Sequence, residues 1–219
     1  MPVSTYDEVI SSCELSLSKL QTPYVDLFLI HTPFAYSPDN DALLQQYRAC
    51  VTLKERGLVR EIGVSNFNIT HLQAIESLEP PFCNQLELHP LCQQRELLAF
   101  MKTKSVIPVA YSSLAPLSSW RNDDDPEDSG KDRGRDAVAK ASEVLEAIAG
   151  RHGKSTAQVL LRWGVQKGYK ILPKSIKLAR MQQNLDIDFV MEAKDMADLD
   201  GLRGESDLPL AWGFGDPTK

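Results

Sequence analysis

Short apolar segments alternate with helical patterns along the chain, and this alternation constrains the fold more than any other feature. The segment Tyr24–His31 is rich in strand-forming residues and is ended by Pro33. Apolar runs of this length are typical of strands buried on both faces of a parallel sheet. The pattern predicts strands over 24–31, 59–64, 83–88, 106–111 and 169–172, and helices over 4–20, 41–56, 69–78, 93–104, 137–167 and 177–184.

Local signals mark two helix starts and one loop. Ser4 and Asp7 are spaced as a capping box for the first helix. Ser155 is the expected N-cap of a second helix within 137–167, because it follows a glycine that ends the first. The stretch 117–136 is polar and rich in aspartate, which predicts a long mobile loop.

Repetition of strand, crossover helix and strand predicts an α/β fold, a parallel sheet with helices outside it. Five strands are fewer than the eight of a closed (β/α) barrel, and a doubly wound open sheet fits the same pattern. Periodicity alone leaves both architectures open. The 219 residues contain no linker and no internal repeat, so we expect a single domain over residues 1–219.

Composition excludes several classes of protein. The formal charge of −6 argues against a nucleic-acid or anionic-membrane surface. No apolar run approaches the roughly 18 to 20 residues of a membrane span, and the first residues lack the basic and apolar regions of a signal peptide. The cysteines show no metal-binding spacing, so we expect reduced thiols in a cytoplasmic protein at Cys13, Cys50, Cys83 and Cys92.

Five motifs distinguish between the architectures. They are Leu29-Ile30-His31-Thr32-Pro33, Gly57 through Phe67, Asn84-Gln85-Leu86-Glu87-Leu88-His89-Pro90, Ala110-Tyr111-Ser112-Ser113-Leu114, and Leu172-Pro173-Lys174-Ser175 followed by Arg180 and Asn184. In this order the motifs resemble those of the aldo-keto reductases, including L-I-H-x-P, N-Q-x-E-x-H-P, A-Y-S-P-L and the phosphate-binding I-P-K-S segment. The resemblance covers nearly the whole chain and implies a TIM-type (β/α) barrel.

The same register implies that the barrel is incomplete. In the family, the strand that ends in L-I-H-x-P is the fourth of eight, whereas here it is the first expected strand. The resemblance therefore implies that the first three strands are absent, together with the family's catalytic Asp, Tyr and Lys. Of the four catalytic positions only His31 has a counterpart, at the strand end where barrels build their active sites.

The resemblance also implies how the chain would hold NADP(H). Ser65, Asn66 and Gln85 would bind the carboxamide of the nicotinamide, and Tyr111 would stack on its ring. Ser112 and Leu114 belong to the same motif. Lys174, Ser175 and Arg180 would bind the adenosine 2′-phosphate, beside Asn184 and Gln183, which stands where the family often has Glu.

A metal site is not expected. Glu87 and His89 alternate along a predicted strand, but one carboxylate and one imidazole are too few ligands for a protein metal centre. The family match interprets both residues as structural. Trp163 and Trp212 are expected to be aromatic residues of the core or its rim.

Three functions remain open for such a chain. The first is an NADP(H)-linked oxidoreductase acting on carbonyl or alcohol groups, with ordinary reduction absent or very slow because no Tyr donates the proton. The second is a redox-neutral lyase, isomerase or cyclase that uses His31 as acid or base. The third is a non-catalytic NADP(H)-binding or regulatory protein. Loss of the N-terminus by gene decay or mis-annotation would fit the same register.

Two expectations concern partners. Five strands leave two exposed sheet edges, which a second copy, a separate partner, the tail 203–219 or collapse into an open sheet would cover. Of these we expect a homodimer. The loops 32–42, 115–136 and 203–219 would set substrate choice, and their aromatic residues favour an apolar or aromatic small molecule. Those aromatic residues are Phe34, Tyr36, Trp120, Trp212 and Phe214.

Overall fold

The computed structural model describes residues 5–33, 40–117 and 135–211. The predicted loop 117–136 and the aromatic residues expected to line the substrate loops therefore lie outside the described residues, except for the ends of that loop. No helix within the described ranges is both long enough and apolar enough to cross a membrane.

Five strands form one sheet in the order β1-β2-β3-β4-β5. The strands are β1 (Val25–Ile30), β2 (Val59–Ser65), β3 (Cys83–Glu87), β4 (Ile107–Tyr111) and β5 (Lys170–Ile171). The pairs β1–β2, β2–β3 and β4–β5 are parallel. The α/β fold with five parallel strands is confirmed, and this sheet falls three strands short of a closed barrel.

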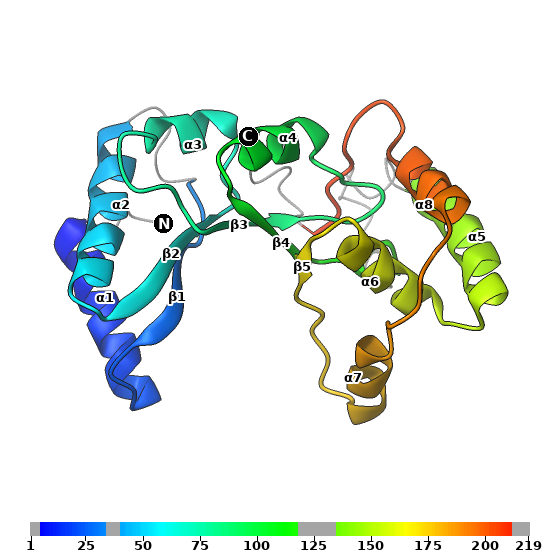
Figure 1. Ribbon diagram of the computed structural model, residues 1–219, viewed down its shortest axis with the longest axis horizontal. Helices are drawn as coiled ribbons and strands as arrows, with labels where there is room; N and C mark the ends of the chain where they lie inside the picture. The colour runs from blue at the N-terminus through cyan, green and yellow to red at the C-terminus, as the bar shows by residue number, and fades with distance from the viewer. Residues whose placement is uncertain (1–4, 34–39, 118–134, 212–219) are drawn as a thin grey trace, which may run out of the picture. The chain divides into compact units, whose positions relative to one another are not determined.

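Helices follow or precede these strands as the alternation predicts (Figure 1). They are α1 (Tyr6–Leu20), α2 (Asn40–Glu55), α3 (Ile69–Ala74), α4 (Arg95–Thr103), α5 (Arg135–His152), α6 (Thr156–Gln166), α7 (Leu178–Leu185) and α8 (Ala193–Asp200), with short 3₁₀ turns η2 (Ala115–Leu117) and η5 (Gly201–Arg203). Ser155 is the N-cap of α6, as predicted. Helix α8 was not predicted.

The capping box of α1 lies one residue later than predicted. Its N-cap is Thr5, whose Oγ1 accepts a hydrogen bond from the Glu8 N–H at 3.3 Å. The Glu8 carboxylate accepts one from the Thr5 N–H at 2.7 Å. The prediction from Ser4 and Asp7 was wrong, because the reciprocal bond comes from the glutamate three residues after the cap.

The described chain forms two compact units, 5–86 with 96–108 and 87–95 with 109–211. The expectation of a single domain stays a prediction. In the first unit α1 and α2 lie side by side (Figure 1). Close packing around strand β2 requires a glycine, because a Cβ on Gly63 would lie 2.5 Å from Leu29 Cδ2 and 3.1 Å from the Cys83 carbonyl oxygen.

Strand β1 departs from the expectation of burial on both faces. Asp26 and Leu27 are exposed, and only Ile30 of this strand is fully buried. The reason is position, because β1 has a hydrogen-bonded neighbour on one side only. The apolar run in the sequence therefore predicts the position of the strand correctly, but it does not predict how far the side chains of the strand are buried.

In the second unit the core lies between α5, α6 and α8. Trp163 is buried as predicted, and its indole N–H donates to Asp200 Oδ1 at 2.9 Å. Asp195 of α8 is also buried and accepts hydrogen bonds from His152 at 2.7 Å and Arg151 at 2.5 Å. These contacts fix α8 against α5.

Candidate cofactor site

A cluster of polar groups forms in the first unit where strands β1 and β2 end. The Ser65 hydroxyl donates to the Gln85 carbonyl oxygen at 2.8 Å, and the Asn66 N–H donates to the same oxygen at 2.9 Å. The Asn66 side-chain amide donates to the His31 carbonyl oxygen at 3.0 Å. Four of the predicted site residues are thus brought together, at the strand end where barrels place their sites.

The geometry of Asn66 explains why this position is polar. Its φ of 62° is in the left-handed region, which asparagine tolerates better than most residues. Its side chain is buried, so the amide needs hydrogen-bond partners, and Ser65 Oγ at 3.1 Å supplies a second acceptor. Asn66 therefore ends β2 and ties it to the residue that follows β1.

His31 contributes its backbone to this cluster and leaves its side chain exposed. An exposed imidazole is able to reach a ligand and to exchange a proton with it. This placement agrees with a functional position and does not fit a buried histidine satisfied by backbone groups.

The second unit contains a cavity of about 370 Å³ beyond the carboxyl ends of β4 and β5. Its lining comes from the two segments that follow these strands and from one residue near the end of the described chain. The lining residues are Ser112, Ser113, Leu114, Ala115, Leu172, Pro173, Lys174 and Ala211. Three of them, Ser112, Leu114 and Lys174, were predicted from the sequence.

Ser113 is one of the five lining residues that sequence reasoning did not assign to the site. It is buried, and its hydroxyl has no hydrogen-bond partner among the described residues. A buried hydroxyl without a partner is costly, which points to a ligand that completes it. The sequence did carry a signal: Ser113 stands where the family motif A-Y-S-P-L has proline. Ser112, its neighbour, has a φ of 52° and turns the chain as β4 ends.

Glu87 holds one wall of the cavity in place. Its buried Oε1 accepts hydrogen bonds from the backbone N–H groups of Leu210 and, at 2.8 Å, Ala211. The same oxygen lies 2.9 Å from His89 Nε2. These contacts support the structural interpretation of Glu87 and His89. The described residues contain no group of three or more potential metal ligands, and the absence of a metal stays a prediction.

The predicted phosphate-binding residues lie around the start of α7. Ser175 Oγ accepts from the Lys177 N–H at 3.1 Å and so shapes the turn that enters the helix. No side chain caps the first turn of α7. Lys174, Arg180 and Gln183 are exposed, and Asn184 is half-buried. Of this set the structure places only Lys174 in the lining of the cavity.

Tyr111 ends β4, directly before the lining residues. It is half-buried, and its carbonyl oxygen accepts a hydrogen bond from the Leu88 N–H at 3.4 Å. Tyr111, whose ring was predicted to stack on nicotinamide, is therefore next in sequence to the lining residue Ser112 but does not itself line the cavity.

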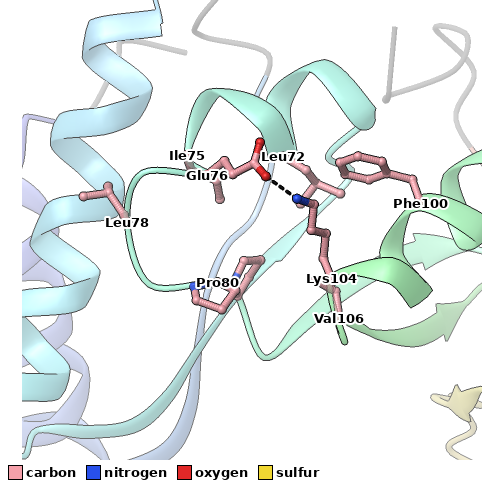
Figure 2. Close-up of a pocket in the computed structure, with 9 residues that line it drawn as sticks. Leu72, Ile75, Glu76, Leu78, Pro80, Phe100, Lys104 and Val106 are labelled. Atoms are coloured by element: carbon pink, nitrogen blue, oxygen red, sulfur yellow. Dashed lines mark hydrogen bonds and ion pairs between the residues drawn. The ribbon is translucent and has the colours of Figure 1, made fainter.

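A second cavity, of about 240 Å³, lies in the first unit beside α3 and α4 (Figure 2). Most of its lining is apolar, including Leu72, Ile75 and Phe100. The two charged residues at it, Glu76 and Lys104, form an ion pair with each other. Because its charges are already paired, this cavity is a weaker candidate for chemistry than the first.

Comparison with known proteins agrees with the motifs. A model of the Aldo/keto reductase family matches residues 1–203. The chain belongs to the aldo/keto reductase family. It is 38% identical over 186 residues to methylglyoxal reductase DkgA of Yersinia pestis, and the alignment covers 84% of this chain and 60% of that protein. It is 36% identical over 200 residues to glyoxal reductase of Bacillus subtilis, covering 90% of this chain and 63% of that protein.

Solved aldo-keto reductases share the fold. The apo form of Gox0644 has a TM-score of 0.79 at 31% identity, covering 99% of this chain and 71% of that structure. An aldo-keto reductase of Bombyx mori in complex with NADP has a TM-score of 0.76 at 30% identity, covering 91% of this chain and 64% of that structure. The resemblance stated from the motifs is confirmed, and the family uses NADP(H). The chain spans about three fifths of the length of the two curated relatives named above.

Proposed function

We propose that this chain is an NADP(H)-binding protein of aldo-keto-reductase type. It would retain the cofactor site, while ordinary carbonyl reduction would be absent or very slow. The observation that supports this most is the cavity beyond β4 and β5, where Ser113, whose buried hydroxyl has no partner in the described part of the chain, lies in the same lining as Lys174. A phosphate-bearing dinucleotide offers both acceptors for the hydroxyl and negative charge for the ammonium.

The family resemblance assigns the roles of the other residues. Ser65, Asn66 and Gln85 would bind the carboxamide of the nicotinamide, and Tyr111 would stack on its ring, while Ser112 and Leu114 of the same motif would also contact the cofactor. Lys174, Ser175 and Arg180 would hold the adenosine 2′-phosphate, with Gln183 and Asn184 on the adenosine. When bound, NADP(H) supplies or accepts a hydride. His31 would orient a carbonyl oxygen of the substrate from its exposed position.

We propose that the three tyrosines described in the first unit are unsuited to deliver a proton beside His31. In the first unit the Tyr6 hydroxyl donates to Thr52 at 2.8 Å, and Arg60 lies over the Tyr24 ring. Burial raises the pKa of Tyr47, the opposite of what a proton donor near neutral pH requires. None of these three tyrosines is paired with a lysine, so we propose that carbonyl reduction by this chain is absent or very slow.

The cofactor proposal is tested by titrating the protein with NADPH and NADH, following nucleotide fluorescence or heat. Lys174→Ala and Arg180→Ala should each weaken NADPH binding about tenfold or more and affect NADH much less, because each removes a charged partner of the 2′-phosphate. Lys170→Ala is the matched control, an exposed lysine on β5 outside the cavity lining. Equal loss in all three variants, or no NADPH binding by the unchanged protein, would refute the proposal.

Turnover separates the oxidoreductase from a non-catalytic binding protein. The names of the relatives suggest methylglyoxal and glyoxal as first substrates. Tight NADPH binding with a rate far below that of an intact reductase supports the binding protein, and a normal rate contradicts the proposed loss of turnover. A redox-neutral enzyme would show no NADPH binding but a product that disappears in His31→Ala.

We also propose that a small molecule and a second copy of the chain are its partners, in a cytoplasmic setting. Strands β1 and β5 each have one hydrogen-bonded neighbour in the described sheet. Exposed strand edges favour further pairing, so a second copy is an economical way to cover them. All four cysteines are free and buried, which agrees with a reducing compartment.

A further inference from the structure

Helix α7 exposes an unusual amount of apolar side chain. None of its residues is buried, and Leu178, Met181 and Leu185 are 70%, 40% and 83% exposed. Their spacing of three and four residues places them on one side of the helix. Ile176, directly before the helix, and Val190, shortly after it, are 81% and 71% exposed. We call these five residues the α7 apolar face.

The opposite side of the same helix is polar. Arg180 and Gln183 lie on the side of the helix opposite Leu178 and Leu185, and Asn184, three residues after Met181, lies at the border between the two sides. These are residues that the proposed function assigns to NADP(H). The helix is therefore two-sided, and the proposed cofactor residues leave its apolar side uncovered.

The size of the α7 apolar face argues that it is covered in solution. Monomeric soluble proteins rarely expose contiguous apolar patches above a few hundred Å². Five large side chains at 40–83% exposure approach that limit. Burying these five side chains against a similar surface would remove a few hundred Å² from each copy, which is a part of the roughly 800 Å² per partner in a standard protein interface.

Charge at the two ends of α7 indicates which partner fits. Lys177 is exposed at its N-terminal end and Asp188 beyond its C-terminal end, while Asp186 is already paired with Lys154 at 2.8 Å. In an antiparallel pair of two α7 helices, each basic end would lie opposite an acidic end. A two-fold axis brings the same surface together on both copies, so the surface must be self-complementary, and this one is. Antiparallel helix dipoles favour the same arrangement.

We propose that the α7 apolar face is a self-association surface, on which α7 packs antiparallel against α7 of a second copy of this chain. This deepens the second-copy proposal above by naming the residues that make the contact. It does not require that NADP(H) binds, because the polar side of α7 stays outside the contact.

The experiment is sedimentation of the full chain over a wide concentration range, with and without two substitutions. Leu178→Glu combined with Leu185→Glu should weaken the dimer roughly 100-fold or more, because two carboxylates would be buried against apolar side chains. Leu15→Glu is the matched control, since Leu15 is 55% exposed on α1. Both positions on α7 are so exposed that the variants should fold, which circular dichroism would verify.

A charge exchange tests the antiparallel orientation. Lys177→Asp alone should weaken the dimer, because it places two acidic residues opposite each other. Adding Asp188→Lys should restore the dimer, because residues 177 and 188 of the two copies then again carry opposite charges. NADPH titration of the same variants separates this proposal from the proposed function: Arg180→Ala should weaken cofactor binding and leave the dimer intact. The proposal is overturned if the unchanged chain is monomeric throughout, if it binds only an unrelated polypeptide on this face, or if the double glutamate variant sediments like the control.

Discussion

Replacing Glu87 with alanine should loosen the cavity from a distance, because Glu87 is a positioning residue that touches no ligand in our proposal. One buried carboxylate oxygen accepts from the Leu210 and Ala211 N–H groups and faces His89 Nε2. Each donor left without a partner costs about 1–3 kcal/mol, less where water reaches it. Since Ala211 is half-buried, we expect the free energy of unfolding to fall by about 3 kcal/mol.

The measurement combines urea unfolding with hydrogen exchange at residues 208–211. Glu87→Ala should release these amides and weaken NADPH binding, since Ala211 lines the cavity. Glu87→Gln is the conservative control, because its side-chain oxygen still accepts the same bonds, and it should cost about 1 kcal/mol and keep the amides protected. Unchanged exchange at 208–211 in Glu87→Ala, at equal NADPH affinity, would show that the carboxylate does not hold this wall.

Three further predictions follow from single contacts. Ser113→Ala should leave the free protein equally stable or slightly more stable, since it removes a buried hydroxyl without a partner, yet weaken NADPH binding several-fold in a titration. Burial raises the pKa of Asp195, but its hydrogen bonds from His152 and Arg151 outweigh this and lower it overall. Its contribution to stability is therefore present above the unfolded pKa of about 3.9 and lost as pH falls through the lower folded value, so urea unfolding should show the deficit of Asp195→Asn shrinking below about pH 4. Gly63→Ala should lower the unfolding free energy by about 1–3 kcal/mol through overcrowding, seen as a reduced Tm.

The sequence predicted the order and type of most elements because apolar periodicity reports burial against the sheet directly. It failed for α8, whose buried residues are few and include a charged one, Asp195. Only the structure shows that His152 and Arg151 satisfy that carboxylate, and they are more than forty residues away in sequence. A buried charged residue does not add to the apolar periodicity of a sequence. A helix that is held in place by such a residue is therefore predicted as a solvent-exposed segment.

The residues of the candidate site fall into two groups: those that local motifs predict, and those whose role depends on contacts between distant parts of the sequence. Motifs predicted Ser65, Asn66 and Lys174 as site residues because their types and spacing are local properties of the chain. The role of Glu87 in holding Ala211 depends on a contact across more than 120 residues, which no local pattern encodes. Ser113 was visible as a departure from the motif, but its meaning required knowing that its hydroxyl is buried without a partner.

In our proposal, NADP(H) binding and carbonyl reduction depend on different residues. The groups that would hold a dinucleotide follow strands β2 to β5, so each is positioned by the segment on which it lies. Proton delivery instead requires a tyrosine whose pKa is lowered by a neighbouring lysine, and the three tyrosines described in the first unit are hydrogen-bonded to Thr52, placed against Arg60, or buried with a raised pKa. Affinity for NADP(H) and the rate of carbonyl reduction should therefore respond to different substitutions, because Lys174 and Arg180 are proposed to act on the first and not on proton delivery.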